Sequence, residues 1–270
     1  MSRTLLVIPN YNDTRRLRPF LGDLLRFLPA NFSVLVSDDG SGKKEREELK
    51  DLIEKSRSLT IGPGPTLLDP IFAPRNTGKG GAVHRGWEHG NGFSLIAFAD
   101  ADGAVSASEI VRAEIFLRFE DSGADAVFAS RIKMLGRSIQ RSLVRHLTGR
   151  VFATLVSIVG GIPTYDTQCG LKIIKWEAYQ EIRPYFQTRG FAFDVELCML
   201  LLTMGKKIVE FPIDWHDVSG GKINLFADSI RMAVEVIQIR RRTDSLKSTL
   251  KDGIRQHHSR PTVSSAHHVI

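Results

Sequence analysis

The chain has 270 residues, long enough for one large domain or two small ones, and 42% of them are apolar, which is sufficient for a hydrophobic core. Its formal net charge of +7 is uneven, because residues 240–270 hold seven Lys or Arg and two Asp, so the rest of the chain is close to neutral. Two cysteines, no signal peptide and no apolar run of about 20 residues argue against a disulfide-rich secreted protein and a membrane-spanning one, and we expect a cytoplasmic protein.

The first third of the chain alternates apolar segments with polar ones. An apolar run at residues 4–8 precedes Pro-Asn-Tyr-Asn-Asp, and a second run at 33–36 precedes Ser-Asp-Asp-Gly-Ser. Strands that alternate with helical stretches predict an α/β fold with a parallel sheet, whose site lies along the carboxyl edge. A glycine-rich segment follows, flanked by Arg75 and Lys79. Glycines let the backbone approach a ligand closely, and cations offset the charge of a diphosphate.

The next apolar run, residues 95–98, leads into Ala-Asp-Ala-Asp-Gly. Asp100 and Asp102 are two residues apart, so at the end of a strand both carboxylates point to the same side. Mg²⁺ takes oxygen ligands, usually one or two carboxylates together with substrate phosphates. The segment therefore predicts a metal–diphosphate site, although Asp and Gly also end strands and open turns without any metal.

The segment at residues 138–159 has the pattern of a helix with two different faces. Apolar residues recur there at helical spacing, and arginines recur every four residues at Arg137, Arg141 and Arg145. Such a helix either lies in the interface of a bilayer or packs on the core with a solvated face.

Residues 243–270 are basic and rich in Ser and His, with few large apolar residues. This composition predicts a disordered tail after a domain of residues 1–242. A basic tail can lie on an anionic membrane surface. Nucleic acid is not an expected partner, because no stacking platform or recognition motif accompanies the charge.

Seven motifs, in this order and spacing, make the chain resemble the family 2 glycosyltransferases. They occupy residues 9–13, 38–41, 76–83, 99–104, 130–131, 166–172 and 192–196, and Trp215 and residues 220–222 complete the set. Within that family the chain is most similar to dolichyl-phosphate β-glucosyltransferases and related polyprenyl-phosphate enzymes. The resemblance implies the GT-A fold, a Rossmann-like, mostly parallel sheet flanked by helices in a single domain.

The resemblance also implies a binding site for a nucleotide sugar. The donor-binding residues would be Pro9, Tyr11, Asp13, Asp39, Arg75, Lys79, Asp100 and Asp102. Asp39 would accept a hydrogen bond from uracil, and Asp102 would be the first ligand of Mg²⁺ or Mn²⁺, with Asp100 on the metal or the ribose. The chain departs from its relatives at Asp13, where they have Glu, and at Asn10, where a small residue is common.

The acceptor side and the catalytic carboxylate follow from the same resemblance. The residues expected to hold an acceptor phosphate are Arg131, Arg141 and Arg145. Guanidinium groups suit this role because they bind phosphate in a bidentate manner. Asp194 and Asp166 are two candidates for the catalytic carboxylate, between which the sequence does not choose. Trp215 and Lys222 would close over the sugar or its phosphates.

The function implied is that of an inverting glycosyltransferase that moves a hexose, with glucose from UDP-glucose favoured, to a polyprenyl or dolichyl phosphate. Without a membrane anchor, it would act as a peripheral protein on the cytoplasmic face of a membrane. Transfer to a soluble acceptor or a secondary metabolite is the alternative within the family. A sugar-nucleotide pyrophosphorylase would need a glycine-rich loop after the first strand, which residues 9–13 do not provide. A non-catalytic nucleotide-sugar-binding module is disfavoured because the acidic positions of an active enzyme are present.

Overall fold

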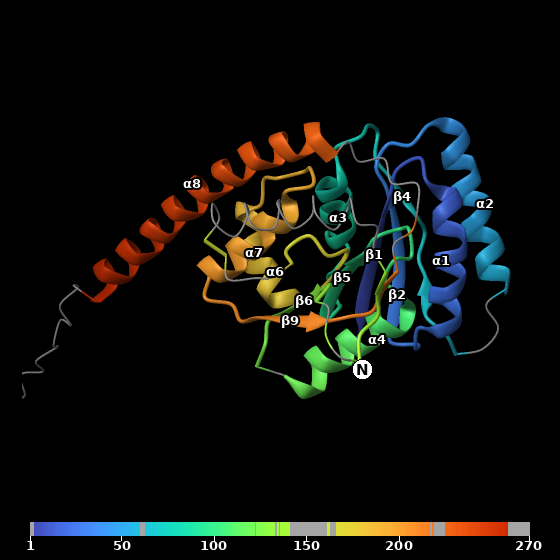
Figure 1. Ribbon diagram of the computed structural model, residues 1–270, viewed down its shortest axis with the longest axis horizontal. Helices are drawn as coiled ribbons and strands as arrows, with labels where there is room; N and C mark the ends of the chain where they lie inside the picture. Colours follow the sequence, from blue (N-terminus) through green and yellow to red (C-terminus); the bar gives the residue numbers. More distant parts are fainter. Residues whose placement is uncertain are drawn as a thin grey trace, which may run out of the picture.

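The apolar runs of the sequence form the central strands of an eight-stranded sheet (Figure 1). The computed structural model describes residues 3–59, 63–121, 123–132, 134, 136–140, 161–162, 166–216, 218 and 225–258. Within these residues no helix is both long and apolar enough to cross a membrane.

The sheet is mostly parallel, as predicted for a single α/β domain. Its strands are β1 (Thr4–Asn10), β2 (Phe32–Asp38), β3 (Thr66–Leu67), β4 (Ile71–Phe72), β5 (Leu95–Ala99), β6 (Ala126–Ser130), β8 (Leu171–Lys175) and β9 (Ile208–Pro212). Their order is β3-β2-β1-β5-β8-β6-β9, with β4 also paired to β2. Only β8 runs antiparallel to its neighbours among the described pairs. A separate ribbon pairs β7 (Ile139–Gln140) with β10 (Trp215–His216).

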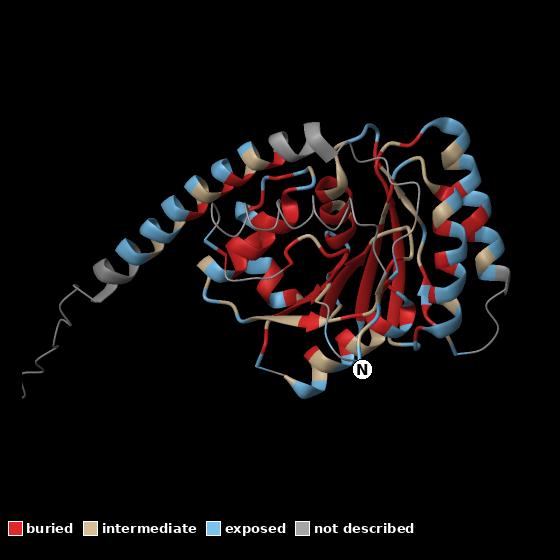
Figure 2. Cartoon of the chain, in the orientation of Figure 1, coloured by how far each residue is buried: buried red, intermediate tan, exposed pale blue. Residues whose placement is uncertain are grey.

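Helices cover both faces of the sheet. They are α1 (Thr14–Phe27), α2 (Lys43–Leu59), α3 (Lys79–Trp87), α4 (Ala107–Ile115), α6 (Trp176–Ile182), α7 (Phe193–Thr203) and α8 (Leu225–His258), with a π-helical turn η1 (Phe116–Glu120) and a 3₁₀ turn η2 (Arg183–Tyr185). Side chains alternate along β1, so Leu6 and Ile8 pack under α1, α2 and α4, whereas Leu5 and Val7 pack under α3, α6 and α7. Figure 2 shows these buried layers on the two sides of the sheet.

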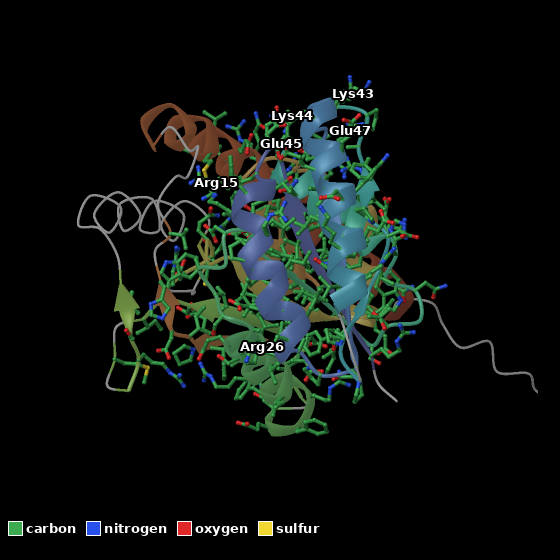
Figure 3. The ribbon with its side chains drawn as sticks, turned by 90° about the vertical axis from the view of Figure 1, so that its right-hand side faces the viewer. Arg15, Arg26, Lys43, Lys44, Glu45 and Glu47 are labelled. Carbon is green, nitrogen blue, oxygen red and sulfur yellow. The ribbon has the colours of Figure 1, made fainter. Side chains whose placement is uncertain are left out.

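The carboxyl ends of β1 and β2 lie level with each other, because Asn10 is paired with Asp38. Each strand leads directly into a helix, so α1 and α2 begin at the same edge. Figure 3 shows Arg15 at the start of α1 near Lys43 and Lys44 at the start of α2, with Arg26 at the opposite end of α1. The edge where the site was expected is therefore also the edge where helices begin.

The predicted disordered tail is wrong for residues 243–258, which continue α8. The physical reason is that Thr243 is buried on the same side of the helix as Val236 and Ile239, and Leu246 packs against the same cluster. In Figure 1, α8 lies across α7 and its C-terminal half extends beyond the sheet. Residues 259–270 lie outside the described part of the chain.

The helix predicted from residue 138 does not begin there, because β7 occupies Ile139–Gln140. Two backbone observations account for this strand. The Ser138 amide donates to Asp214 Oδ1 at 2.7 Å, and the Trp215 amide donates to the Ser138 carbonyl at 3.0 Å. Residues 141–160, which carry the rest of that pattern, lie outside the described residues.

Candidate functional site

Asp100 and Asp102 lie in the turn that follows β5. The Asp100 amide donates to the Gly170 carbonyl at 3.0 Å, and a Cβ atom on Gly170 would collide with the Asp100 carboxylate, so this glycine makes room for it. The Ala104 amide donates to Asp102 Oδ1 at 3.1 Å, across Gly103 with φ of 70°. The two acidic side chains keep 29% and 25% of their surface exposed, so both are accessible at the edge of the sheet.

Lys79, the first residue of α3, joins this pair of acids. Its Nζ lies 2.6 Å from Asp100 Oδ1 and packs over the rings of Phe98 and Phe193 at 5.0 and 5.7 Å. Burial opposes the charged form, but Asp100 and Asp194 outweigh it and raise the pKa of Lys79 above its usual value. The ammonium is therefore charged at neutral pH and directed at the acidic turn.

The electrostatics of Asp102 favour a bound cation. Burial and then the charge of Asp100 raise the pKa of Asp102, while the Ala104 amide and Arg16, 3.9 Å away, act in the opposite direction. The described residues contain no cluster of three or more potential metal ligands. Two carboxylates are nevertheless the protein contribution that Mg²⁺ commonly uses when substrate phosphates complete its shell. The donor set therefore fits a divalent cation bound together with a diphosphate.

Asp39, just beyond β2, holds the glycine-rich segment that precedes α3. Its buried carboxylate accepts hydrogen bonds from the Thr77 amide at 3.0 Å, the Thr77 hydroxyl at 2.6 Å and the Gly78 amide at 2.6 Å. Arg85 adds a charge at 3.6 Å. Gly78 has φ of 96°, a conformation that favours glycine. The structure thus gives Asp39 a positioning role, and its predicted contact with a base stays a prediction.

The other predicted donor residues border the same edge. Pro9 is half-buried near the end of β1, and Tyr11 is exposed just after that strand. Asp13 precedes α1 and accepts a hydrogen bond from Arg16 Nε at 2.8 Å. Arg75 is exposed between β4 and α3. All four lie around the carboxyl ends of β1 and β2.

Asp194 is buried near the start of α7 and paired with a lysine that sequence reasoning missed. Lys172 of β8 is fully buried, and its Nζ lies 2.7 Å from Asp194 Oδ1 and donates to the Cys169 carbonyl at 2.8 Å. Burial raises the pKa of Asp194, and Lys172 and Lys79 oppose that shift. The sequence contains one sign of this pair, because Lys172 is a charged residue within the otherwise apolar run 171–174. A lysine buried in a strand requires a partner of opposite charge.

Asp166 forms a bidentate ion pair with Arg131. The distances are 2.6 Å from Nε and 2.8 Å from Nη2, and the Arg131 amide also donates to Asp166 at 3.2 Å. The guanidinium lies 4.8 Å from the ring centroid of the buried Trp215. Burial disfavours this cation, but Asp166 outweighs that effect and raises the pKa of Arg131. The predicted residues Arg141, Arg145 and Lys222 lie outside the described residues.

The structure thus arranges the predicted residues in two adjoining groups. One consists of Lys79, Asp100, Asp102 and Asp194, and the other of Arg131, Asp166 and Trp215. The segment 166–170 connects them, since its first residue pairs with Arg131 and its last packs against Asp100. A cation and two open acids therefore lie near a second, arginine-containing group, an arrangement suited to binding two phosphate-bearing substrates.

Comparison with known proteins identifies related chains. The profile of "Glycosyl transferase family 2" matches residues 5–183. The chain is 34% identical over 249 residues to a dolichyl-phosphate beta-glucosyltransferase of Saccharomyces cerevisiae, with 87% of this chain and 73% of the relative covered. A protein of the same name from Dictyostelium discoideum is 30% identical over 246 residues, at the same coverage.

The fold matches that of solved enzymes. One is glucosyl-3-phosphoglycerate synthase from Mycobacterium tuberculosis, crystallised with Mn²⁺, uridine diphosphate and phosphoglyceric acid. The two structures match with a TM-score of 0.62 and 13% sequence identity, and the match covers 90% of this chain and 78% of the synthase. At this identity the similarity shows that the fold is shared.

Proposed function

The chain belongs to glycosyltransferase family 2, and we propose that it transfers glucose from UDP-glucose to the phosphate of a polyprenyl lipid such as dolichyl phosphate. The observation that supports this most is the group formed by Lys79, Asp100 and Asp102 at the carboxyl edge of the sheet. It supplies the cation and the oxygen ligands that a metal-bound diphosphate requires. The relatives named for dolichyl phosphate supply the acceptor class.

On the donor side, Asp102 together with Asp100 would hold Mg²⁺ or Mn²⁺. Such an ion, when bound, offsets the charge that develops on the departing diphosphate. Lys79 would add a second positive charge from the N-terminus of α3, where the helix dipole also favours an anion. Pro9 and Tyr11 would flank the base, with Asp39 holding the segment that leads to Lys79.

The chemical step we propose is a single displacement. An oxygen of the acceptor phosphate forms a bond to the anomeric carbon, and the bond from that carbon to the diphosphate oxygen breaks. The electron pair of the broken bond leaves with UDP, and because the phosphate oxygen attacks from the face opposite the departing UDP, the configuration at the anomeric carbon inverts. A phosphate monoester with a second pKa near 6 is mostly dianionic at pH 7, so the attack needs little help from a general base.

This chemistry suits the burial of the two catalytic candidates. Asp194 is 1% exposed and held by Lys172, and Asp166 is occupied by Arg131. We infer that both act by orienting cations: Asp194 sets the charge around Lys79, and Asp166 fixes the guanidinium of Arg131 for the acceptor phosphate. With a hydroxyl acceptor, one of them would instead have to accept a proton.

The lipid acceptor also implies contact with a membrane surface. Lys247 and Lys251 are exposed and belong to the C-terminal half of α8. Figure 1 shows that this half of the helix extends beyond the sheet. Each basic residue near anionic headgroups contributes roughly 1 kcal/mol of attraction. Binding to anionic liposomes should therefore decrease as salt increases and should weaken in a Lys247→Glu/Lys251→Glu variant. Equal binding to neutral and anionic liposomes would contradict this contact.

The proposed function is tested with a panel of nucleotide sugars, each offered to a short, water-soluble polyprenyl phosphate in the presence of Mn²⁺ or Mg²⁺. We expect UDP-glucose to give UDP and a glucosylated lipid phosphate. Transfer only to soluble hydroxyl acceptors would favour the alternative family 2 activity. Release of pyrophosphate from UTP and a sugar phosphate would indicate a pyrophosphorylase. Binding of UDP without any turnover would indicate a non-catalytic module.

A further inference from the structure

We propose that Arg242 of α8 is a positioning residue for the donor site, acting through Glu196 of α7 and the segment that precedes α7. The inference rests on the proposed function and extends it to a helix that lies beyond the seven motifs. It makes the middle of α8 a functional part of the transferase domain.

The proposal rests on an ion pair between the buried Glu196 of α7 and the partly exposed Arg242 of α8. Arg242 Nη2 lies 2.6 Å from Glu196 Oε1, and the Glu196 side chain is 2% exposed. The other oxygen of Glu196 accepts hydrogen bonds from the amides of Gln187 at 3.0 Å and Thr188 at 2.6 Å. Arg242 also donates to the Thr188 hydroxyl at 3.1 Å and to Gln187 Oε1 at 3.3 Å. One carboxylate and one guanidinium therefore fix the start of the segment 187–190.

The same segment contacts the start of α3. The Gly81 amide donates to the Arg189 carbonyl at 2.9 Å, and the Gly80 amide donates to the Gly190 carbonyl at 3.3 Å. These two glycines have no room for a side chain, because a Cβ on Gly80 would meet Phe193 and a Cβ on Gly81 would meet Thr77. Segment 187–190 is thus packed directly against the helix that begins with Lys79.

The backbone on both sides of Lys79 is consequently held by hydrogen bonds from two directions. Asp39 binds the amides of Thr77 and Gly78 from β2, and the carbonyls of residues 189 and 190 bind the amides of Gly80 and Gly81 from the α7 side. Lys79 lies between these two supports and pairs with Asp100. Loss of Arg242 would leave the buried Glu196 charge without its cation, so the second support would loosen.

The test compares Arg242→Ala with Arg241→Ala, which changes an exposed neighbour on the same helix. Hydrogen–deuterium exchange should accelerate in Arg242→Ala for peptides covering residues 187–190 and 79–81, while the strands of the sheet keep their protection. The KM for UDP-glucose and the dissociation constant of UDP should both increase about tenfold, with kcat nearly unchanged. Arg242→Lys, which keeps the charge but not the forked contact, should fall between wild type and Arg242→Ala.

Unchanged exchange and unchanged donor KM in Arg242→Ala would overturn the proposal, as would a loss of kcat at constant KM. If Arg242→Ala fails to fold, the same measurements are made on Arg242→Lys. Wild-type exchange together with a wild-type KM for UDP-glucose in Arg242→Lys would also overturn the proposal. A wild-type chain that neither binds UDP nor transfers glucose would contradict the proposed function. The exchange measurement would still report whether Arg242 fixes segment 187–190.

Discussion

Two pairs of acidic residues in the candidate site differ sharply in their surroundings. Asp100 and Asp102 keep 29% and 25% of their side-chain surface exposed; Asp100 is paired with Lys79 at 2.6 Å, and Asp102 has only a distant cation at 3.9 Å. Asp194 and Asp166 keep 2% and 10%, and each has its own close cation, Lys172 at 2.7 Å and Arg131 at 2.6 Å. The first pair is partly open to a ligand and contains one carboxylate without a close cation, whereas both carboxylates of the second pair are buried and bound to a cation of the protein.

From this difference we infer that acidic residues in the motifs of one protein have two different roles. Open carboxylates that repel each other gain from a divalent cation, so they suit ligand binding. Buried carboxylates with a dedicated cation stabilise the site and orient that cation. Mutations at the two pairs should therefore separate activity from stability.

The largest effect is expected for Asp102→Asn on turnover. The change removes a negative charge from the open pair, so metal–diphosphate binding in the transition state should weaken and kcat/KM should fall about 10²- to 10³-fold. Steady-state rates over a Mn²⁺ titration measure this, with thermal unfolding as a check that the fold is intact. Asp51→Asn, on the outer face of α2, is the matched control. Wild-type activity of Asp102→Asn, or full wild-type activity in excess EDTA, would contradict metal binding by the open pair.

Asp194→Asn should have its main effect on stability. It leaves the fully buried Lys172 without a counter-charge, so the free energy of unfolding should fall by about 3 kcal/mol. Chemical denaturation followed by fluorescence measures the change. The double variant Lys172→Met/Asp194→Asn removes the unpaired charge and should recover part of the loss. A loss for Asp194→Asn that is no larger than that for Asp102→Asn would remove the distinction between the two pairs.

Of the two substrates, Arg131→Ala should affect the acceptor only, and it should also lower stability because the buried Asp166 loses its cation. Hydrogen bonds to charged groups contribute about 1.5–3 kcal/mol, so the KM for a short polyprenyl phosphate should increase at least about tenfold. The KM for UDP-glucose should stay constant, and Arg131→Lys should be intermediate because it cannot form the two parallel bonds. Arg15→Ala, at the start of α1, is the control (Figure 3). A parallel loss of donor affinity would assign Arg131 to the donor site or to structure.

The smallest effect concerns pH and Asp102. Burial and the charge of Asp100 raise the pKa of Asp102 in the folded state. The protonated carboxyl therefore contributes stability that is fully present below the unfolded-state pKa. This stability is lost as the pH rises through the folded-state pKa. Asp102→Asn should therefore be at least as stable as wild type at pH 7, and its advantage should shrink toward pH 3. Denaturant midpoints at the two pH values test this. If the stability of Asp102→Asn relative to wild type is lower at pH 7 than at pH 3, the raised pKa of Asp102 is contradicted.

Much of the fold was predictable because its strands are local apolar runs ended by turn residues. Residues 4–8, 33–36 and 95–98 became β1, β2 and β5 with only their ends extended. The antiparallel insertion of β8 between β5 and β6 was not predicted, because strand order depends on contacts between distant segments. The first half of the supposed tail was misjudged because its basic composition outweighed the helical spacing of Ile239, Thr243 and Leu246, which places them on one side of α8.

For the candidate site, the sequence predicted residues that the structure places at the carboxyl edge of the sheet, and their roles stay predictions. The motifs led to Asp100, Asp102 and Lys79, since strand-end acids and glycine-rich segments have recognisable local patterns. They did not reveal which charges pair, because Arg242 and Glu196 are 46 residues apart and meet only when α8 packs on α7. The same holds for Arg131 and Asp166, which are 35 residues apart.

The most direct test of the account is the configuration of the product formed from UDP-glucose and a short polyprenyl phosphate. Proton and phosphorus NMR of the purified lipid report how glucose is linked to phosphate. Because UDP-glucose carries an α-linkage and the proposed displacement inverts it, we expect a β-glucosyl phosphate, whose formation requires a divalent cation and is at least about 10²-fold slower with Asp102→Asn. An α-linked product, or glucose transfer to a soluble acceptor with no lipid product, would contradict it.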